Sequence, residues 1–282
     1  MDDQPVAKVA PPWKLKGTVY MVNFYCKEGT LPEHAYSPLE RGSSFAGAET
    51  GKHLGGISQF QLIRYTESPV GPYDEFIVWP GQFQYDVEEG GRRKVKTNAR
   101  ITRIYVSQQR SCWNGRHNWN IPKHLARFEW EDLVGGSTHV KVFPQDTEHP
   151  TTETTSVEKP LFQATFQPIK YAPSIPFSLS WAKYIGLDVA LVQPPLPMGQ
   201  DGKSELPGTD RWCRIAPMQD TNKAKLGWVD LSQKNEQGIQ ESSVEFDNFW
   251  PGIGRWQVGL KLEDADIVFG EGVYWDPPRT NL

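Results

Sequence analysis

The lysine at position 123 is the side chain of this sequence whose surroundings most directly suggest chemistry. It lies in the run GRHNWNIPKHL (residues 115–125), directly after Pro122 and among Trp119, Ile121 and Leu125. An ammonium group held among apolar side chains loses hydration, which favours the neutral amine. A neutral amine can attack a carbonyl carbon and form a Schiff base. Taken alone, the run is more typical of a turn that enters a surface element and leaves the lysine in water.

Two other stretches carry residues that could serve such a site. The run RYTESPVGPYDE (residues 64–75) contains Tyr65, Glu67 and Glu75, and WPGIGRW (residues 250–256) adds tryptophans near the C-terminus. Carboxylates and phenols close to an amine can transfer protons during Schiff-base chemistry. Spacing alone favours another reading of Glu67, as an exposed glutamate at a strand end.

Together, these stretches resemble the acetoacetate decarboxylase family. Gly-Arg followed by Pro-Lys-x-Leu is similar to the family's active-site segment, in which the lysine after the proline forms the Schiff base. Residues 64–75 are similar to the family's strand with Tyr-Thr-Glu-Ser, and residues 250–256 to a C-terminal Trp-x-Gly-Pro-x-Arg segment. The matches follow the family's order and span roughly residues 13–275.

The resemblance implies a role for each matching residue. Lys123 is the expected nucleophile and Glu67 the acidic residue that lines the same cavity, so these two are the predicted catalytic residues. Arg116 is expected to pair with a carboxylate or with carbonyl oxygens. The predicted substrate-binding residues are Arg116, His124, Glu75, Tyr65 and Trp119.

Several positions depart from the family pattern. Decarboxylating members carry a second lysine after the Schiff-base lysine, and here that place is His124, which is mostly neutral near pH 7. The arginine that meets the substrate carboxylate aligns with Thr18, and Gln59 and Gln61 stand near the place of a second cavity glutamate. Schiff-base chemistry on a carbonyl compound other than a β-keto acid therefore remains open.

The periodicity of the sequence predicts a mainly β fold. Residues 18–25, 57–63, 75–79, 101–106, 140–143, 162–166 and 258–262 are rich in β-branched and aromatic residues, and Gly and Pro turns separate them. Helices are expected only before Lys123 and over 178–184, and long loops over 145–159, 194–210 and 234–243. We predict a flexible tail (1–12) and one domain (13–282), an antiparallel, cone-like β-barrel around a central cavity, as in the family.

Composition excludes several classes of protein. The net charge of −4 and the short basic cluster at 92–96, read as a hairpin tip, argue against a nucleic-acid partner. Three scattered cysteines form no disulfide framework, and no apolar run reaches the length that spans a membrane. No sequence typical of a metal or nucleotide site is present, so no cofactor is expected. We expect a cytoplasmic location.

The function that follows is a Schiff-base-dependent carbon–carbon lyase, similar to a decarboxylase, that acts on a β-keto acid or a related small carbonyl compound, in secondary metabolism. The alternative is a non-covalent small-molecule binding protein, or a cyclase, with an aromatic-lined cavity and no Schiff-base chemistry. A homo-oligomer is expected in either case.

Overall fold

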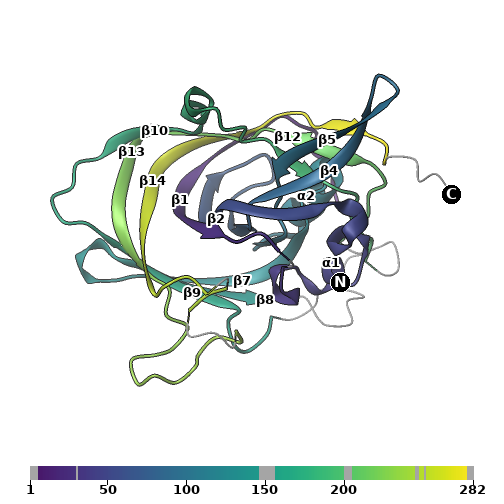
Figure 1. The fold of residues 1–282 in the computed structure, drawn as a ribbon. Helices are drawn as coiled ribbons and strands as arrows, with labels where there is room; N and C mark the ends of the chain where they lie inside the picture. The colour runs from purple at the N-terminus through teal and green to yellow at the C-terminus, as the bar shows by residue number, and fades with distance from the viewer. Residues whose placement is uncertain are drawn as a thin grey trace.

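Nine strands close into a barrel that forms the centre of the molecule (Figure 1). The computed structural model describes residues 6–29, 31–145, 156–199, 205–244, 248–250 and 252–277. Around the barrel, β1 pairs with β14, followed by β13, β9, β8, β7, β6, β3 and β2, and β2 pairs again with β1. All these pairs are antiparallel except β6 with β7. Their bounds are β1 Trp13–Cys26, β2 Lys52–Glu67, β3 Tyr73–Trp79, β6 Arg103–Val106, β7 Lys123–Asp132, β8 Thr138–Pro144, β9 Phe162–Pro168, β13 Met218–Asp230 and β14 Trp256–Phe269.

A smaller group of strands extends one side of the barrel. The first part of β2 leaves the barrel and pairs with β4, and β5, β11, β12 and β15 continue from there. Helix α2 lies between this group and the barrel strands (Figure 1). The remaining bounds are β4 Gln82–Glu89, β5 Arg92–Ala99, β10 Ile175–Ser178, β11 Leu191–Gln193, β12 Trp212–Ile215, β15 Val273–Trp275, α1 Pro38–Arg41, α2 Gln109–Trp119, and the 3-10 helices Glu33–Ala35, Ser44–Ala46, Ala48–Thr50, Val134–Gly136 and Leu179–Ile185.

Successive residues of each barrel strand point to opposite faces, so the sheet supports two separate cores. Aromatic rings fill one core: Phe76 stacks on Phe162 with centroids 4.5 Å apart, and Phe60 lies 5.4 Å from Phe162. Because β2 and β3 are not neighbours of β9 in the sheet, these rings must meet across the barrel interior. The other face carries Ile63, Ile104 and similar residues, and packs with residues of α2 and of the second group of strands.

The structure confirms the mainly β prediction, with 50% strand and 13% helix, well below the usual third of residues in helices. Each of the seven predicted strand segments overlaps a strand, and α2 is the helix expected before Lys123. The segment at 178–184 is 3-10 helix, and the basic residues 92–96 follow the Gly90-Gly91 tip of the β4–β5 hairpin. Of the barrel strands, β7 and β13 were missed, and so were β10, β11, β12 and β15 outside the barrel. The predicted loop at 145–159 falls largely outside the described residues.

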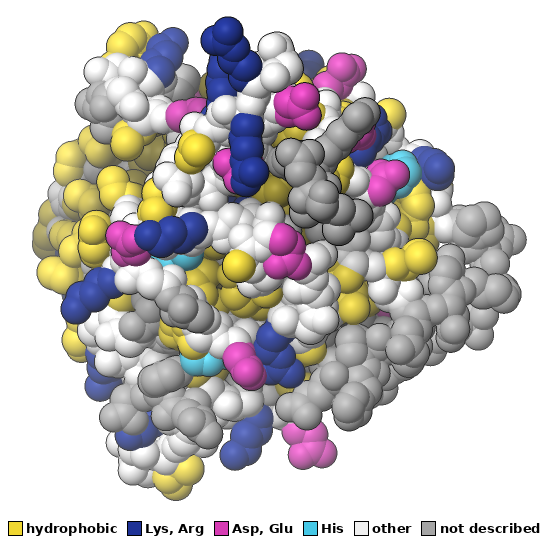
Figure 2. All heavy atoms as spheres, turned by 45° about the vertical axis from the view of Figure 1, so that its right-hand side comes forward, with side chains coloured by type: hydrophobic (Ala, Val, Ile, Leu, Met, Phe, Trp, Pro, Cys, Tyr) yellow, Lys and Arg dark blue, Asp and Glu magenta, His cyan; other side chains and the backbone are white. Residues whose placement is uncertain are grey.

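The N-terminal segment is attached to the domain where the structure describes it. The backbone N–H of Val9 donates to Asn114 and its carbonyl accepts from Asn118, both on α2. Residues 7–9 are therefore docked, which differs from the flexible tail predicted over 1–12. No helix in the described residues is long and apolar enough to span a membrane. On the face drawn in Figure 2, cationic and acidic side chains are interspersed.

Replacement of Phe76 by alanine tests whether the aromatic core holds the barrel closed. Phe76 is 0% exposed and stacks on a ring from a distant strand, so its loss leaves a cavity between strands. We expect Phe76→Ala to lower the free energy of unfolding by about 3–5 kcal/mol in a denaturant titration. Tyr25→Ala is the control: Tyr25 is 71% exposed, and its loss should change stability by only about 0.5 kcal/mol. Equal effects of the two variants would contradict this account.

Candidate functional site

The end of α2 delivers Lys123 to the start of a barrel strand. Asn120 caps the helix in the left-handed conformation (φ 53°, ψ 29°), which asparagine tolerates better than most residues. Pro122 disfavours further helix, because the residue before a proline prefers an extended backbone. The chain then enters β7, where Lys123 pairs in register with Ile104 of the parallel strand β6. The predicted Pro-Lys segment is therefore the junction of a strand–helix–strand unit.

Lys123 lies in a buried cluster of polar side chains, which we call the lysine cluster. Its side chain is 5% exposed, and its Nζ lies 2.6 Å from Oε2 of Glu75. The Oγ of Ser111 accepts a second hydrogen bond from Nζ at 3.1 Å, and the Tyr73 ring centroid is 5.2 Å away. The hydroxyl of Tyr65 donates to the other oxygen of Glu75 at 2.9 Å. The cluster therefore places a carboxylate and three hydroxyl groups around one amine.

Strand register and one glycine explain how Lys123 reaches Glu75. Glu75 pairs with Val106 of β6, and Lys123 pairs with Ile104 two residues earlier, so both side chains point to the same face. The lysine stem passes over α2 at Gly115. A Cβ at this position would lie 2.5 Å from Cδ of Lys123 and 2.7 Å from Cε. Gly115 thus leaves the space that the lysine needs.

Electrostatics keep the two phenols of the cluster protonated. Burial, and then the charge of Glu75, raise the pKa of Tyr65 well above its usual range, and the same causes raise the pKa of Tyr73. Interactions with Ser111 and Tyr65 offset only part of this rise in the pKa of Tyr73. Neutral phenols donate hydrogen bonds, which leaves the carboxylate of Glu75 as the group placed to take a proton from Lys123.

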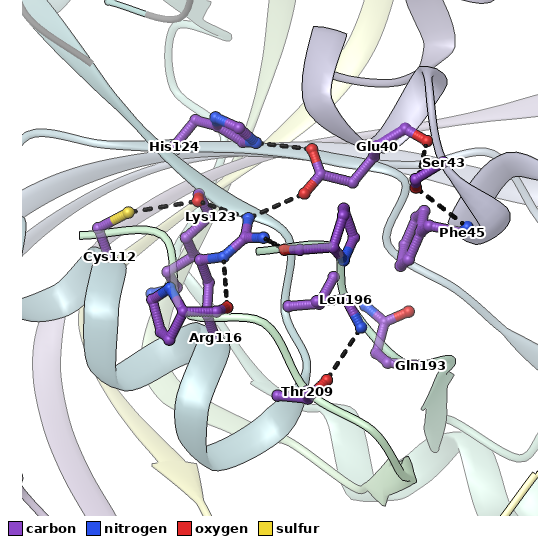
Figure 3. A network of polar contacts seen from close by, with 12 residues as sticks. Glu40, Ser43, Phe45, Cys112, Arg116, Lys123, His124, Gln193, Leu196 and Thr209 are labelled. Atoms are coloured by element: carbon purple, nitrogen blue, oxygen red, sulfur yellow. Dashed lines mark hydrogen bonds and ion pairs between the residues drawn. The ribbon is translucent and has the colours of Figure 1, made fainter. Parts of the chain in front are cut away.

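A second buried network lies on the other side of the Lys123 backbone (Figure 3). Arg116 donates to Oε1 of Glu40 at 2.8 Å, to the Lys123 carbonyl at 3.2 Å and to the carbonyls of Pro197 and Pro207. Its pairing with a carboxylate and with carbonyl oxygens is the arrangement expected from the sequence. In this arrangement the guanidinium is 0% exposed and engaged with the protein itself.

Three predicted site residues lie elsewhere. Glu67 is exposed at the end of β2, so it does not belong to the buried cluster around Lys123. Glu75 is the carboxylate in contact with the lysine. The ring of Trp119 packs edge-on against Trp13 at 5.1 Å, and its Nε1–H donates to the Gly270 carbonyl, so it belongs to the core. His124 points to the opposite side of β7 from Lys123, where its Nε2 lies 2.6 Å from Oε2 of Glu40. Alternation along the strand causes this separation.

Two predicted residues belong to the lysine cluster: Glu75 contacts Lys123, and Tyr65 contacts Glu75. Three members of the cluster were missed or ranked low. Tyr65 and Glu75 lie in the lysine cluster as members of the run 64–75. Ser111 and Tyr73 were not predicted: Ser111 lies twelve residues before Lys123, and no sequence pattern marks it. Glu75 was ranked below Glu67, although its place directly before the apolar residues 76–78 was a signal for a buried side chain.

The departures from the family pattern do not contact the Lys123 amine. Thr18 lines a pocket of about 690 Å³ with Tyr20, Arg64 and Lys261; Tyr65 and Tyr73 of the lysine cluster also line this pocket, whereas Lys123 does not. Gln61 is buried and bonds with Gln219 in an uncharged amide pair. Among the described residues, no group of three His, Cys, Asp or Glu side chains could hold a metal ion.

Comparison with solved structures identifies the fold of this chain. No family model and no curated protein matches the chain. It is similar to the crystal structure of acetoacetate decarboxylase from Legionella pneumophila subsp. pneumophila str. Philadelphia 1, with a TM-score of 0.51 and 12% identity over 94% of this chain and 88% of that one. A second acetoacetate decarboxylase structure gives 0.52 and 12% over 97% and 93%. The chain has an acetoacetate decarboxylase-like fold. At this identity the likeness establishes the fold alone.

Replacement of Gly115 by alanine tests the packing of the lysine stem. Alanine favours a helix over glycine by about 1 kcal/mol, but here its Cβ would overlap Lys123. We expect Gly115→Ala to lower the free energy of unfolding by about 1–3 kcal/mol. Gly270→Ala, with no atom near the added Cβ, should stay within about 0.5 kcal/mol. Combined with Lys123→Ala, the Gly115→Ala change should become neutral or stabilising. A cost that persists without the lysine stem would contradict this packing.

Proposed function

We propose that this protein is a lysine-dependent carbon–carbon lyase that binds a β-keto acid or a related carbonyl compound as a Schiff base on Lys123. The observation that supports this proposal most is the buried contact of 2.6 Å between the lysine amine and the Glu75 carboxylate. A lysine with this degree of burial is uncommon unless it is paired or functional. The acetoacetate decarboxylase-like fold is consistent with the proposal.

Schiff-base formation needs a proton acceptor beside the amine. Glu75 takes a proton from Lys123, and the neutral amine donates its electron pair to the carbonyl carbon of the substrate. The nitrogen then loses one proton and the carbonyl oxygen gains one, and water leaves once that oxygen receives the proton that Glu75 took, which gives an iminium ion. Glu75 and the hydroxyls of Ser111 and Tyr65 are the groups placed to transfer these protons.

The iminium then serves as the acceptor for a carbon–carbon bond. When the bond from the α carbon to a carboxylate or to a hydroxyl-bearing carbon breaks, its electron pair moves to the iminium nitrogen and an enamine forms. The departing fragment leaves as carbon dioxide or, with loss of the hydroxyl proton, as a second carbonyl compound. Protonation of the enamine carbon and hydrolysis of the regenerated iminium release the product and the free lysine. The burial of Lys123 and Glu75 limits water access and side reactions.

The surroundings of Lys123 favour a substrate without a carboxylate at the lysine. The recorded contacts of Nζ in the described part of the chain are Glu75, Ser111 and the Tyr73 ring, and none of them is cationic. A β-keto acid would bring its negative charge close to Glu75 with no opposing guanidinium. Neutral diketones or hydroxyketones would avoid that repulsion. We include a homo-oligomeric state and a cytoplasmic location in this proposal.

A non-covalent binding protein is the second candidate. The observation that favours it is a pocket of about 690 Å³ beside the lysine cluster, lined by Tyr20, Arg64, Lys261, Tyr65 and Tyr73 but not by Lys123. In that case, the pair of Lys123 and Glu75 would be a structural ion pair, and a ligand would occupy the pocket without a covalent bond.

Borohydride reduction in the presence of pentane-2,4-dione tests the covalent proposal. We expect a stable adduct on Lys123, located by peptide mass mapping, and no adduct there in Lys123→Arg. Lys27→Arg, which changes an exposed lysine, should leave the adduct unchanged. Acetoacetate turnover should be slow, because a missing charge-assisted contact to the carboxylate costs on the order of ten- to a hundredfold in rate.

The outcomes separate the two candidates. An adduct on Lys123 with little acetoacetate turnover supports the proposal. Brisk decarboxylation of acetoacetate would mean that the missing cation does not matter for the reaction. The absence of an adduct with every carbonyl compound of a diketone and keto-acid panel would favour the binding protein.

A further inference from the structure

Three ionisable side chains that take no part in the proposed reaction are completely buried behind Lys123. The side chains of Glu40, Arg116 and His124 are each 0% exposed (Figure 3). Glu40 comes from α1, far from the other two in sequence. Each of its oxygens has one partner: Oε1 accepts from Arg116 Nη1 at 2.8 Å, and Oε2 lies 2.6 Å from Nε2 of His124. One carboxylate thus joins the last turn of α2 to the first residues of β7.

A gain in folding stability is a weak explanation for the burial of these three ionisable side chains. Removing charges from water opposes folding, and a buried ion pair often stabilises a protein no more than well-packed apolar residues would. Burial raises the pKa of Glu40, but His124 and Arg116 outweigh that effect and hold it below its usual range. Glu40 therefore remains a carboxylate, and its two contacts stay charge-assisted. Ion sets of this kind can instead favour one precise conformation over others.

The conformation favoured here is that of the Lys123 backbone. Nη1 of Arg116, which binds Glu40, also donates to the Lys123 carbonyl at 3.2 Å, and the Cys112 thiol donates to the same oxygen at 3.2 Å. The next residue, His124, is held by Glu40 on the opposite side of the strand. The peptide unit between Lys123 and His124 is therefore fixed at its carbonyl and through the His124 ring. Rotation of this unit would move Nζ away from Glu75.

We propose that Glu40 is a positioning residue for Lys123: through Arg116 and His124 it fixes the first peptide of β7, so that the lysine amine meets the carboxylate of Glu75. The inference rests on the proposed function of Lys123, but it concerns a residue with no contact to the lysine cluster. Displacing a reacting group by about 1 Å can cost about a hundredfold in rate. Loss of Glu40 should therefore act on the reactivity of Lys123 and leave the affinity for the carbonyl compound nearly unchanged.

The test compares Glu40→Gln with a matched change of another carboxylate that has two cationic partners. Glu263 contacts Lys225 and Lys261 and lies outside both buried networks, so Glu263→Gln is the control. All measurements are made well below the unfolding midpoint of each variant, determined by thermal unfolding. The first is trace labelling with acetic anhydride across pH, in which acetylation of Lys123 is quantified by mass spectrometry relative to the exposed Lys14. This readout needs no substrate.

We expect Glu40→Gln to change the pH profile of Lys123 acetylation and to slow borohydride trapping of pentane-2,4-dione by roughly ten- to a hundredfold. The dione concentration for half-maximal trapping should change by less than about threefold, and Glu263→Gln should match the wild type in every readout. A merely structural role would lower the unfolding midpoint of Glu40→Gln and leave the labelling profile and the trapping rate unchanged. That result would overturn the proposal.

A double-mutant cycle with Glu75→Gln provides the second measurement. If Glu40 acts by bringing Lys123 to Glu75, its replacement should have little further effect on Lys123 acetylation once Glu75 is gone, and the two effects should not add. Additive effects would overturn the proposal. Failure of the proposed function would look different: wild-type Lys123 would show the expected labelling profile and its dependence on Glu40, but no carbonyl compound would be trapped. If Glu40→Gln does not fold, His124→Gln, which breaks one of the two contacts, takes its place in both measurements.

Discussion

The contact between the Lys123 amine and the Glu75 carboxylate is the constraint on which the local structure depends. Both side chains are almost fully buried, and a charged group in such a place needs a partner at short range. Three elements must agree for the contact to form. Strand β6 sets the register between β3 and β7, α2 supplies Ser111 and the space at Gly115, and the cap at Asn120 ends the helix two residues before Pro122. An error in any of them would leave one charge buried alone.

The barrel separates this polar cluster from its aromatic core by the alternation of single strands. Leu62 and Phe76 point into the packed interior, whereas Ile63 and Glu75, their neighbours in the chain, point to the face covered by α2. The rings of Phe76 and Phe162 fill the interior, so this part of the barrel is a packed core rather than a cavity. The buried polar side chains around Lys123 lie on the outer face, where a helix and a second group of strands exclude water.

Sequence reasoning reached the fold class and the segment that carries the buried lysine, because both depend on local signals. Runs such as residues 18–25 carry β-branched and aromatic residues, and Pro122 marks the end of a helix. Strand β7 was missed because its residues after Ala126 alternate among charged and aromatic side chains without a buried apolar row. Glu67 was preferred to Glu75 because it matches the acidic residue of the family's Tyr-Thr-Glu-Ser segment, but a bulge between Lys16 and Gly17 marks where the strand leaves the core. Glu40 could not be found at all, because contacts between distant segments leave no trace in the spacing of one sequence.

The histidine that follows the lysine shows how strand geometry changes the meaning of a departure from a family pattern. A residue directly after Lys123 in an extended strand must point to the other face of the sheet, and His124 does so. Its ring lies against Glu40 and Tyr105 rather than beside the lysine amine. In this protein, a charge at position 124 would therefore act on Nζ through the backbone and the sheet, not by direct contact. The exchange of lysine for histidine at this place consequently bears on how firmly the start of β7 is held, while the groups in contact with the Lys123 amine are Glu75, Ser111 and the Tyr73 ring.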